Sequence, residues 1–255
     1  AGTIDDLMTL NVTATDNVRI EQNVNNVDQL IVDSGMTTQI AAASISVGSA
    51  DFTGDVSVEN DLTLNSDTTV TFNNNLAGTG GDDVLLIDAN GAVQFTGTVQ
   101  TFEELNIDTP AVTRFEDDIS AVDSLKTIGG GTTQFNMLNV KVGTAQFSDS
   151  VEIEQVVTFD GDGLLSFEAA VSGNAATSEL EITNTDDVTF GSTVMSLLRL
   201  EIDATGTTTF DGQVTDIGQL IIAGNGTTSI ETDLIDVGSA SFGNVVSVME
   251  TTQLN

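Results

Sequence analysis

The stretch GTTTFDGQVTDIGQLIIAGNGTTSI, residues 206–230, decides the fold because it contains nearly the same phrase twice. Its opening residues GTTTF (206–210) return 20 residues later as GTTSI (226–230). Catalysis needs one constellation of side chains, placed once, whereas a phrase that returns at a fixed interval is typical of a structural unit stacked on copies of itself. The stretch therefore predicts a repeat architecture.

Apolar residues recur at the same interval of 20 residues along most of the chain. After Phe210 they fall at Val214, Ile217 and Leu220, and the next cycle starts at Ile230. The same ladder runs from residue 95 to residue 135 and, near the N-terminus, from residue 4 to residue 40. We call the residue that opens a cycle, such as Phe210, the marker.

A longer period of 95 residues lies on top of the first. The phrases VGSADF (47–52), VGTAQF (142–147) and VGSASF (237–242) show it directly. Counted from marker to marker, the cycles in this superrepeat are 20, 20, 12, 20 and 23 residues long, with a mean of 19. Ten of the twelve phenylalanines occupy the marker position: Phe52, Phe72, Phe95, Phe115, Phe135, Phe147, Phe167, Phe190, Phe210 and Phe242.

Short alternating segments such as TTTF, QLII and TVTF lie between the markers, and their Thr, Val, Ile and Phe are typical of half-buried strands. Phrases such as GNG, DGDG and NNN separate them and favour turns with left-handed backbone. The alternation predicts that Phe210 and Thr208 point inward while Thr207 and Thr209 point outward. Eight of the residues two before a marker are Thr or Val, which have nearly the same shape: Thr38, Val70, Val93, Thr113, Thr133, Val188, Thr208 and Thr228.

Each cycle is too short to bury its own apolar face, and stacking the cycles solves this problem. At about 4.8 Å spacing, every backbone N–H and C=O pairs with the coil above or below. Right-handed winding is the default for parallel connections. We therefore predict an all-β fold, a right-handed parallel β-solenoid of about 13 coils that covers residues 1–255 as one continuous domain. The alternative, a 95-residue β-sandwich repeated nearly three times, gives no reason for an internal period of 20.

The stretch GTTTFDGQVTDIGQL (206–220) and its relatives resemble the degenerate 19 to 20 residue repeats of large bacterial surface β-solenoids, such as filamentous haemagglutinin-type adhesins. The resemblance covers almost the whole chain and concerns architecture. It implies an extracellular role in adhesion, in a stalk or in a filament. The amino-terminal secretion domain usual in those adhesins is not visible in this sequence.

Charge and composition exclude several classes of function. The net charge is -34, from 39 carboxylates against five basic residues, so nucleic acid and anionic lipid are implausible partners. The chain has no Cys and no His, which removes disulfides, thiol nucleophiles, Cys/His zinc sites and catalytic triads. No apolar run approaches the roughly 20 residues that span a bilayer. We expect an extracellular or cell-surface protein without membrane insertion, and an N-terminal Ala1 suits a mature chain.

The ends of the repeat suggest the function. The repeat of apolar residues begins at Ile4 and continues to Leu254, and the sequence shows no obvious polar cap. A solenoid would therefore expose strand edges that ordinary soluble proteins protect. We predict a structural subunit of an extracellular filament or surface fibre that assembles head to tail with copies of itself. Residues 1–10 and 242–255 would make the contact. The alternative is a section of a larger surface adhesin or stalk, with a host or cell-surface glycan as a possible partner.

A β-helix enzyme acting on carbohydrate is a further alternative. Glycoside hydrolysis needs two carboxylates across a cleft, and the chain has paired acids at 82–83, 117–118 and 186–187. Adjacent acids in a strand point to opposite faces or sit on solvated turns, and basic residues for an acidic polysaccharide are nearly missing. We therefore expect no enzyme, no catalytic residues and no organic cofactor.

Calcium is the one ion that the sequence suggests. Asp160 and Asp162 in DGDG (160–163), and Asp82 and Asp83 in GTGGDDV (78–84), have the oxygen-rich, glycine-permitted composition of a calcium loop. Neither segment matches an EF-hand, and the position of Asp82 is taken by Thr177 one superrepeat later. Diffuse screening by counterions is the alternative.

Ice binding is the last alternative. Outward Thr-x-Thr pairs at Thr69/Thr71 and Thr207/Thr209 are similar to flat threonine faces. Other coils interrupt such an array, for example at Arg114. A thermal hysteresis measurement distinguishes this reading.

Overall fold

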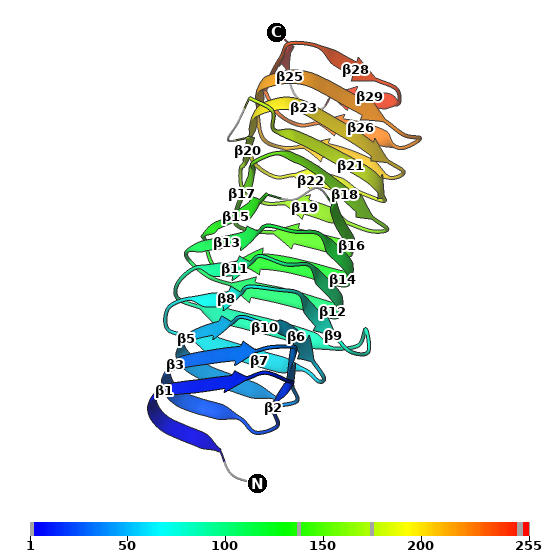
Figure 1. Cartoon of the computed structure of the whole chain (residues 1–255). Coiled ribbons are helices and arrows are strands. Elements are labelled where there is room, and N and C mark those ends of the chain that lie inside the picture. Colours follow the sequence, from blue (N-terminus) through cyan, green and yellow to red (C-terminus); the bar gives the residue numbers. More distant parts are fainter. Residues whose placement is uncertain (1–2, 137–138, 174–175, 249–251, 255) are drawn as a thin grey trace. The chain divides into compact units, whose positions relative to one another are not determined.

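The computed structural model describes residues 3–136, 139–173, 176–248 and 252–254. In these residues all regular secondary structure is β-strand, and the described strand pairings are parallel. The fold is an all-β parallel β-solenoid of about 12 turns, with about 20 residues between stacked strands (Figure 1). The predicted solenoid is confirmed, and the β-sandwich alternative is wrong because strands of consecutive turns pair in parallel, as Phe52 with Phe72 and Phe190 with Phe210 show.

The chain divides into two compact units, Ala1–Gly131 (unit 1) and Thr132–Asn255 (unit 2), and each is described by itself. One continuous domain over residues 1–255 stays a prediction. The strands of unit 1 are β1 (Ile4–Ala14), β2 (Val18–Ile20), β3 (Val24–Ser34), β4 (Thr37–Ile40), β5 (Ser44–Phe52), β6 (Asp55–Val58), β7 (Leu62–Ser66), β8 (Val70–Phe72), β9 (Leu76–Gly78), β10 (Val84–Ala89), β11 (Val93–Phe95), β12 (Val99–Asp108), β13 (Val112–Phe115) and β14 (Ile119–Ile128). The strands of unit 2 are β15 (Thr132–Phe135), β16 (Asn139–Phe147), β17 (Ser150–Ile153), β18 (Val156–Gly161), β19 (Leu165–Phe167), β20 (Val171–Gly173), β21 (Glu179–Thr185), β22 (Val188–Phe190), β23 (Val194–Ala204), β24 (Thr207–Phe210), β25 (Val214–Ala223), β26 (Thr227–Ile230), β27 (Leu234–Val237), β28 (Ala240–Phe242), β29 (Val245–Val248) and β30 (Gln253–Leu254).

Each turn of a unit contributes strand segments to three columns of stacked strands, and one inward residue per turn marks each column. The three columns of unit 1 are Val12, Val32, Phe52, Phe72, Phe95 and Phe115; Val18, Thr38, Val56, Leu76, Val99 and Ile119; and Ile4, Val24, Ile45, Leu64, Ile87 and Ile107. The three columns of unit 2 are Phe147, Phe167, Phe190, Phe210, Ile230 and Val248; Val140, Phe159, Ile182, Ile202, Ile222 and Phe242; and Thr133, Val151, Val171, Val194, Val214, Ile235 and Leu254.

The predicted alternation is confirmed. In β24 the burial pattern alternates, with Thr208 and Phe210 buried and Thr207 and Thr209 half-buried. All eight Thr or Val residues two before a marker are buried. Nine of the ten marker phenylalanines are buried as well, and Phe242 is half-buried in the C-terminal coil.

Stacked phenylalanines form the most regular part of the core. In unit 1 the rings of Phe52, Phe72, Phe95 and Phe115 follow one another with centroid separations of 5.2, 5.3 and 4.9 Å and interplanar angles of 8°, 1° and 6°. The rings of equivalent residues in these consecutive turns therefore lie nearly parallel, one over the next. Offset stacking of this kind adds about 0.5–1.5 kcal/mol per pair beyond the burial of area.

The 12-residue cycle of the sequence interpretation is wrong. Phe52 does not stack on Ile40, twelve residues earlier, but on Val32, twenty residues earlier, while Ile40 pairs with Ile20 and Val58 in another column. The interval of 12 is therefore a step to a different column, not a short coil. Counting it as a coil gave about 13 turns in place of about 12.

This step explains the superrepeat. Ile20 and Phe115 are 95 residues apart in sequence, yet Ile20 lies in β2, which pairs with β4, and Phe115 lies in β13, which pairs with β11. Ile4 and Val99 are also one superrepeat apart and also lie in different columns. One superrepeat thus advances the chain by four full turns and two of the three columns.

Six non-glycine residues with positive φ bend the long strands at a corner. Their φ values lie between 51° and 64°. Each follows the first inward residue of its strand by two positions, and together they obey the 95-residue period: Asp6, Asn26, Thr101, Ala121, Ser196 and Asp216. The sequence predicted left-handed backbone in the glycine-rich turns, where it occurs at Gly81 and Gly224, but gave no sign of it inside strands.

Candidate functional site

The N-terminal coil of unit 1 has an apolar cavity at its outer edge. The cavity measures about 510 Å³, and Ile4, Val12 and Ile20 are among the residues that line it. In the described residues β1 pairs with β3 along one edge and with no strand along the other. Leu7 and Met8 on β1 are 40% and 81% exposed. This end therefore offers unpaired backbone beside uncovered apolar side chains.

The C-terminal coil of unit 2 is open in the same way. Val246 and Val248 of β29 are 37% and 53% exposed, whereas Val56 and Val58, two superrepeats earlier, are 2% and 0% exposed. The difference arises because β9 covers β6, while β29 pairs only with β26 among the described strands. Val246 and Val248 thus occupy inward positions that no other described strand covers.

Strand β30 covers one side of this C-terminal coil. Its two residues lie over β27, with Leu254 paired to Ile235. The Gln253 backbone N–H donates to the Asp233 carbonyl at 2.9 Å, and the Thr252 hydroxyl donates to the Thr232 carbonyl at 2.8 Å. Leu254 is still 67% exposed. Of the predicted contact segments, residues 1–2, 249–251 and 255 lie outside the described residues.

The two carboxylates of the first candidate calcium pair lie in different surroundings. Asp83 is buried, and its Oδ2 accepts the Thr79 N–H at 2.6 Å, the Thr79 hydroxyl at 3.3 Å and the Gly80 N–H at 3.0 Å. Asp82, the next residue, is exposed to solvent. The carboxylate of Asp83 therefore closes its own turn, a role that composition alone did not reveal.

The second candidate calcium pair lies in unit 2. Asp160 is half-buried at the end of β18, with its Oδ2 3.9 Å from Lys141 Nζ, and Asp162 is exposed. Within the described part of the chain, no group of three or more Asp, Glu, His or Cys side chains is placed to hold a metal ion. Calcium binding by Asp82, Asp83, Asp160 or Asp162 stays a prediction.

The other paired acids are engaged with turns. Asp187 Oδ1 accepts the Thr207 N–H at 2.6 Å, and Asp186 Oδ1 accepts the Thr205 hydroxyl at 3.2 Å. Asp117 Oδ1 accepts the N–H of Asp118 at 2.8 Å. The contacts of Asp186 and Asp187 hold successive turns together.

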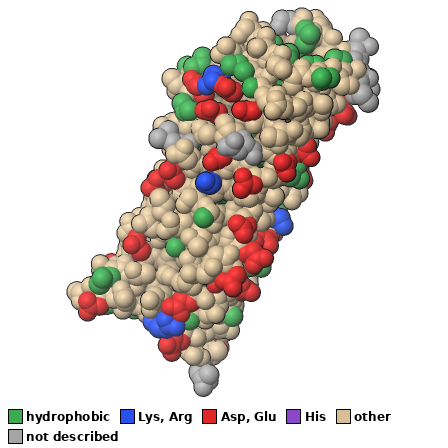
Figure 2. Space-filling view, turned by 90° about the vertical axis from the view of Figure 1, so that its right-hand side faces the viewer, with side chains coloured by type: hydrophobic (Ala, Val, Ile, Leu, Met, Phe, Trp, Pro, Cys, Tyr) green, Lys and Arg blue, Asp and Glu red, His purple; other side chains and the backbone are tan. Residues whose placement is uncertain are grey.

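Carboxylates dominate the surface. Figure 2 shows Asp and Glu side chains spread over the face in view and only a few Lys and Arg side chains among them. Arg19 contacts Glu21 and Glu59, and its hydrogen bond with Glu59, at 2.5 Å, raises the pKa of the guanidinium. Three further basic side chains pair with acids: Lys126 with Glu104, Lys141 with Asp160, and Arg199 with Glu179 and Glu201. The described residues contain no helix of the length and hydropathy needed to cross a bilayer.

Hydrogen bonds from the preceding turn lower the pKa of the Glu168 carboxyl. Its Oε2 accepts the Ser148 hydroxyl at 2.6 Å and its Oε1 accepts the Gln146 amide at 2.5 Å. The Ser148 hydrogen bond, followed by that of Gln146, holds the pKa of the Glu168 carboxyl below its usual value of 4.5. Both donors lie one turn earlier in the chain, so the charged form of Glu168 fastens two adjacent turns.

We expect Ser148→Ala to raise the pKa of Glu168 towards 4.5. A lowered folded-state pKa stabilises the fold above the unfolded value, and this contribution is lost as the pH falls through the folded value. A carboxyl NMR titration of both proteins measures the change. Ser192→Ala, which leaves both donors in place, is the control, and an unchanged Glu168 titration in Ser148→Ala would contradict the assignment.

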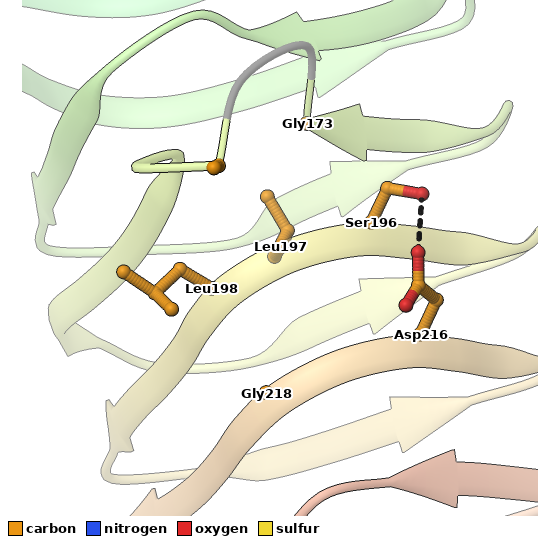
Figure 3. Close-up of a pocket in the computed structure, with 7 residues that line it drawn as sticks. Gly173, Ser196, Leu197, Leu198, Asp216 and Gly218 are labelled. Atoms are coloured by element: carbon orange, nitrogen blue, oxygen red, sulfur yellow. Dashed lines mark hydrogen bonds between the residues drawn. The ribbon is translucent and has the colours of Figure 1, made fainter.

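A shallow concavity lies at the corner of unit 2 that the positive-φ residues form. It measures about 400 Å³, and in Figure 3 the side chains of Ser196 on β23 and Asp216 on β25 point toward one another. The Ser196 hydroxyl donates to Asp216 Oδ2 at 3.0 Å. Asp6 and Asn26, two superrepeats earlier, line a concavity of about 440 Å³ in unit 1. The chain has no histidine, so these two side chains do not belong to a Ser-His-Asp triad.

No protein-family model matches the chain, and neither the curated proteins nor the solved structures include a chain that matches it.

Proposed function

We propose that the protein is a structural subunit of an extracellular filament or surface fibre, in which the C-terminal coil of one copy stacks on the N-terminal coil of the next. The observation that carries the proposal is the exposure of Val246 and Val248, whose superrepeat equivalents Val56 and Val58 are buried under a further strand. The cavity beside Ile4 presents a matching apolar surface at the other end of the chain.

Strand edges support the same proposal. An open parallel edge is a template for pairing with another chain, and ordinary soluble proteins protect such edges. A contact between two different surfaces of one molecule does not close on itself, so it generates a fibre. The repeat resembles those of bacterial surface β-solenoids, and this resemblance supports an extracellular setting.

The second candidate function is a section of a longer surface adhesin or stalk that displays a glycan-binding region. In that case further coils of the same chain would cover β29, and the isolated chain would have no need to assemble. The regular, solvated outer faces of the turns favour neither candidate, so assembly is the property to measure.

We expect the purified chain to form filaments visible by negative-stain electron microscopy, and to form them more readily at high salt. The chain carries a net charge of -34, so copies repel one another. Raising the ionic strength from 0.01 M to 1 M shortens the Debye length from about 30 Å to about 3 Å. Light scattering over a concentration series at both salts measures the threshold. A particle that stays monomeric at both salts would rule out the filament and favour the adhesin section.

A further inference from the structure

We propose that Asn225 is a site of spontaneous deamidation, and that the fold protects Asn90, the other asparagine that precedes a glycine. The dipeptide Asn-Gly occurs twice in the chain, at 90–91 and at 225–226. Both pairs occupy the same place in the cycle, in the turn that leads into a marker strand, β11 for the first and β26 for the second. The reaction needs only a single folded chain and water, so it does not depend on the proposed assembly.

An Asn-Gly pair carries both partners of the reaction. The backbone nitrogen of Gly226, after it loses its proton, attacks Cγ of Asn225; a C–N bond forms, the bond from Cγ to Nδ2 breaks, and the amide group leaves as ammonia. Glycine favours this step because, without a Cβ, its backbone reaches the conformations that ring closure requires. Water then opens the succinimide ring at either carbonyl, which gives aspartate or isoaspartate. Each event adds a carboxylate to the turn, and the isoaspartate product also lengthens its main chain.

The fold requires glycine at the second residue of each pair. A Cβ on Gly91 would lie 2.5 Å from the carbonyl oxygen of Thr68, and a Cβ on Gly226 would collide with the carbonyl oxygen of Gly206. Both carbonyl groups belong to the preceding turn of the solenoid. An asparagine immediately before either glycine is therefore part of a reactive dipeptide because neighbouring turns approach each other closely at this corner.

No hydrogen bond among the described residues holds Asn225 or Gly226, by backbone or by side chain. Asn225 is also exposed to solvent. The first bond after the turn is that of the Thr227 N–H, which donates to the Gly206 carbonyl at 3.0 Å. Strand β26 lies between β24 and β29, so this turn is inside the stack of unit 2. The Gly226 nitrogen can therefore approach the Asn225 side chain without breaking a described contact.

Hydrogen bonds to the turns on both sides hold Asn90 and Gly91. The Asn90 N–H donates to the Ser66 carbonyl of the preceding turn at 3.0 Å. The Gly91 carbonyl accepts the Thr109 hydroxyl of the following turn at 2.8 Å, and Thr109 is buried, so water does not compete for this bond. Ring closure changes the backbone torsions of both residues and would break these contacts. Asn90 is exposed, as Asn225 is, so the two sites differ in backbone hydrogen bonding and not in access to water.

We expect Asn225 to deamidate in the folded chain at least about tenfold faster than Asn90, the factor that one to two ordinary hydrogen bonds produce. The purified chain is incubated at mildly alkaline pH in water enriched in heavy oxygen, and the peptides that contain each asparagine are analysed by mass spectrometry. Incorporation of the isotope identifies deamidation that occurs during the incubation. In urea the two rates should become nearly equal, because the unfolded chain has no turn that holds either pair.

Two variants test the cause of the difference. Thr109→Val removes the hydrogen bond to the Gly91 carbonyl and keeps the shape of the side chain, so deamidation of Asn90 should become about fivefold faster while that of Asn225 stays the same. Asn225→Gln should abolish the fast reaction, because the longer side chain does not form the succinimide ring. Circular dichroism shows whether both variants are folded.

Asn75 is an internal control in every sample. Its Oδ1 accepts the Thr98 N–H at 3.1 Å, and leucine follows it, so it should stay unmodified in the folded chain. Fast deamidation of Asn225 with slow deamidation of Asn90, and nearly equal rates in urea, supports the proposal. Equal rates in the folded chain, or a slow reaction at Asn225, overturns it. The same ratio of rates in urea as in the folded chain also overturns it, because the flanking sequence would then explain the difference.

Discussion

Replacing Phe72 with alanine is expected to lower the free energy of unfolding of unit 1 by about 3–5 kcal/mol, the usual cost of removing a buried phenylalanine. Phe72 is 2% exposed, and its ring is stacked between those of Phe52 and Phe95. Loss of the ring removes two stacking contacts and leaves a cavity between two turns. Urea unfolding followed by circular dichroism measures the change.

A neighbouring residue provides the control for this prediction. Thr71 precedes Phe72 in the same strand and is half-buried on the outer face. We expect Thr71→Ala to change the free energy of unfolding by less than about 1 kcal/mol. Equal losses in the two variants would mean that the ladder of rings is not a main source of stability. Phe72→Leu should fall between them, because it keeps apolar volume but not the stack.

Val248→Glu is expected to abolish filament formation while the subunit stays folded. Val248 faces inward by alternation, as Val58 does two superrepeats earlier, yet it is 53% exposed in the single copy. A carboxylate there would be solvated in the free subunit, and it would be buried without a partner where the C-terminal coil of one copy stacks on the N-terminal coil of the next. Leaving a buried charge unpaired costs about 3–5 kcal/mol, so the assembly threshold should rise by more than about 100-fold.

The matched control for Val248→Glu lies on the same strand. Val245 is 71% exposed on β29, and its superrepeat equivalent, Asp55, already carries a carboxylate on the outer face. Val245→Glu adds the same charge at the same end of the molecule and should shift the threshold only through general repulsion. If both variants assemble like the original chain, the C-terminal coil is not the contact surface.

The fold could be predicted because residues of the same kind recur at the interval of one turn. The spacing of the markers and the Thr or Val two residues before them gave the stacking and the inward faces, and both are confirmed at residues such as Thr208 and Phe210. The column in which each strand lies could not be predicted. A step of 12 residues is the same in sequence whether it makes a short turn or a move between columns, and the pairing of Phe52 with Val32 decides it.

The candidate sites were harder to predict, because their geometry depends on backbone that the composition does not encode. Composition suggested Asp83 as a metal ligand, but it gave no sign that Oδ2 of Asp83 accepts the N–H groups of its own turn. The corner residues Thr101 and Ala121 carry no signature of left-handed backbone, and only their 95-residue spacing from Asp6 and Asn26 links them to a common position.

The shift of column at every superrepeat has a consequence for the fidelity of folding. A chain made of near-copies risks pairing a segment with the wrong copy, since the two offer almost identical partners. Here the copies belong in different columns, as the equivalent residues Ile4 and Val99 show. A segment that paired with the wrong copy would therefore lie in the wrong column, and the segments next to it in the chain would lose their own pairing partners.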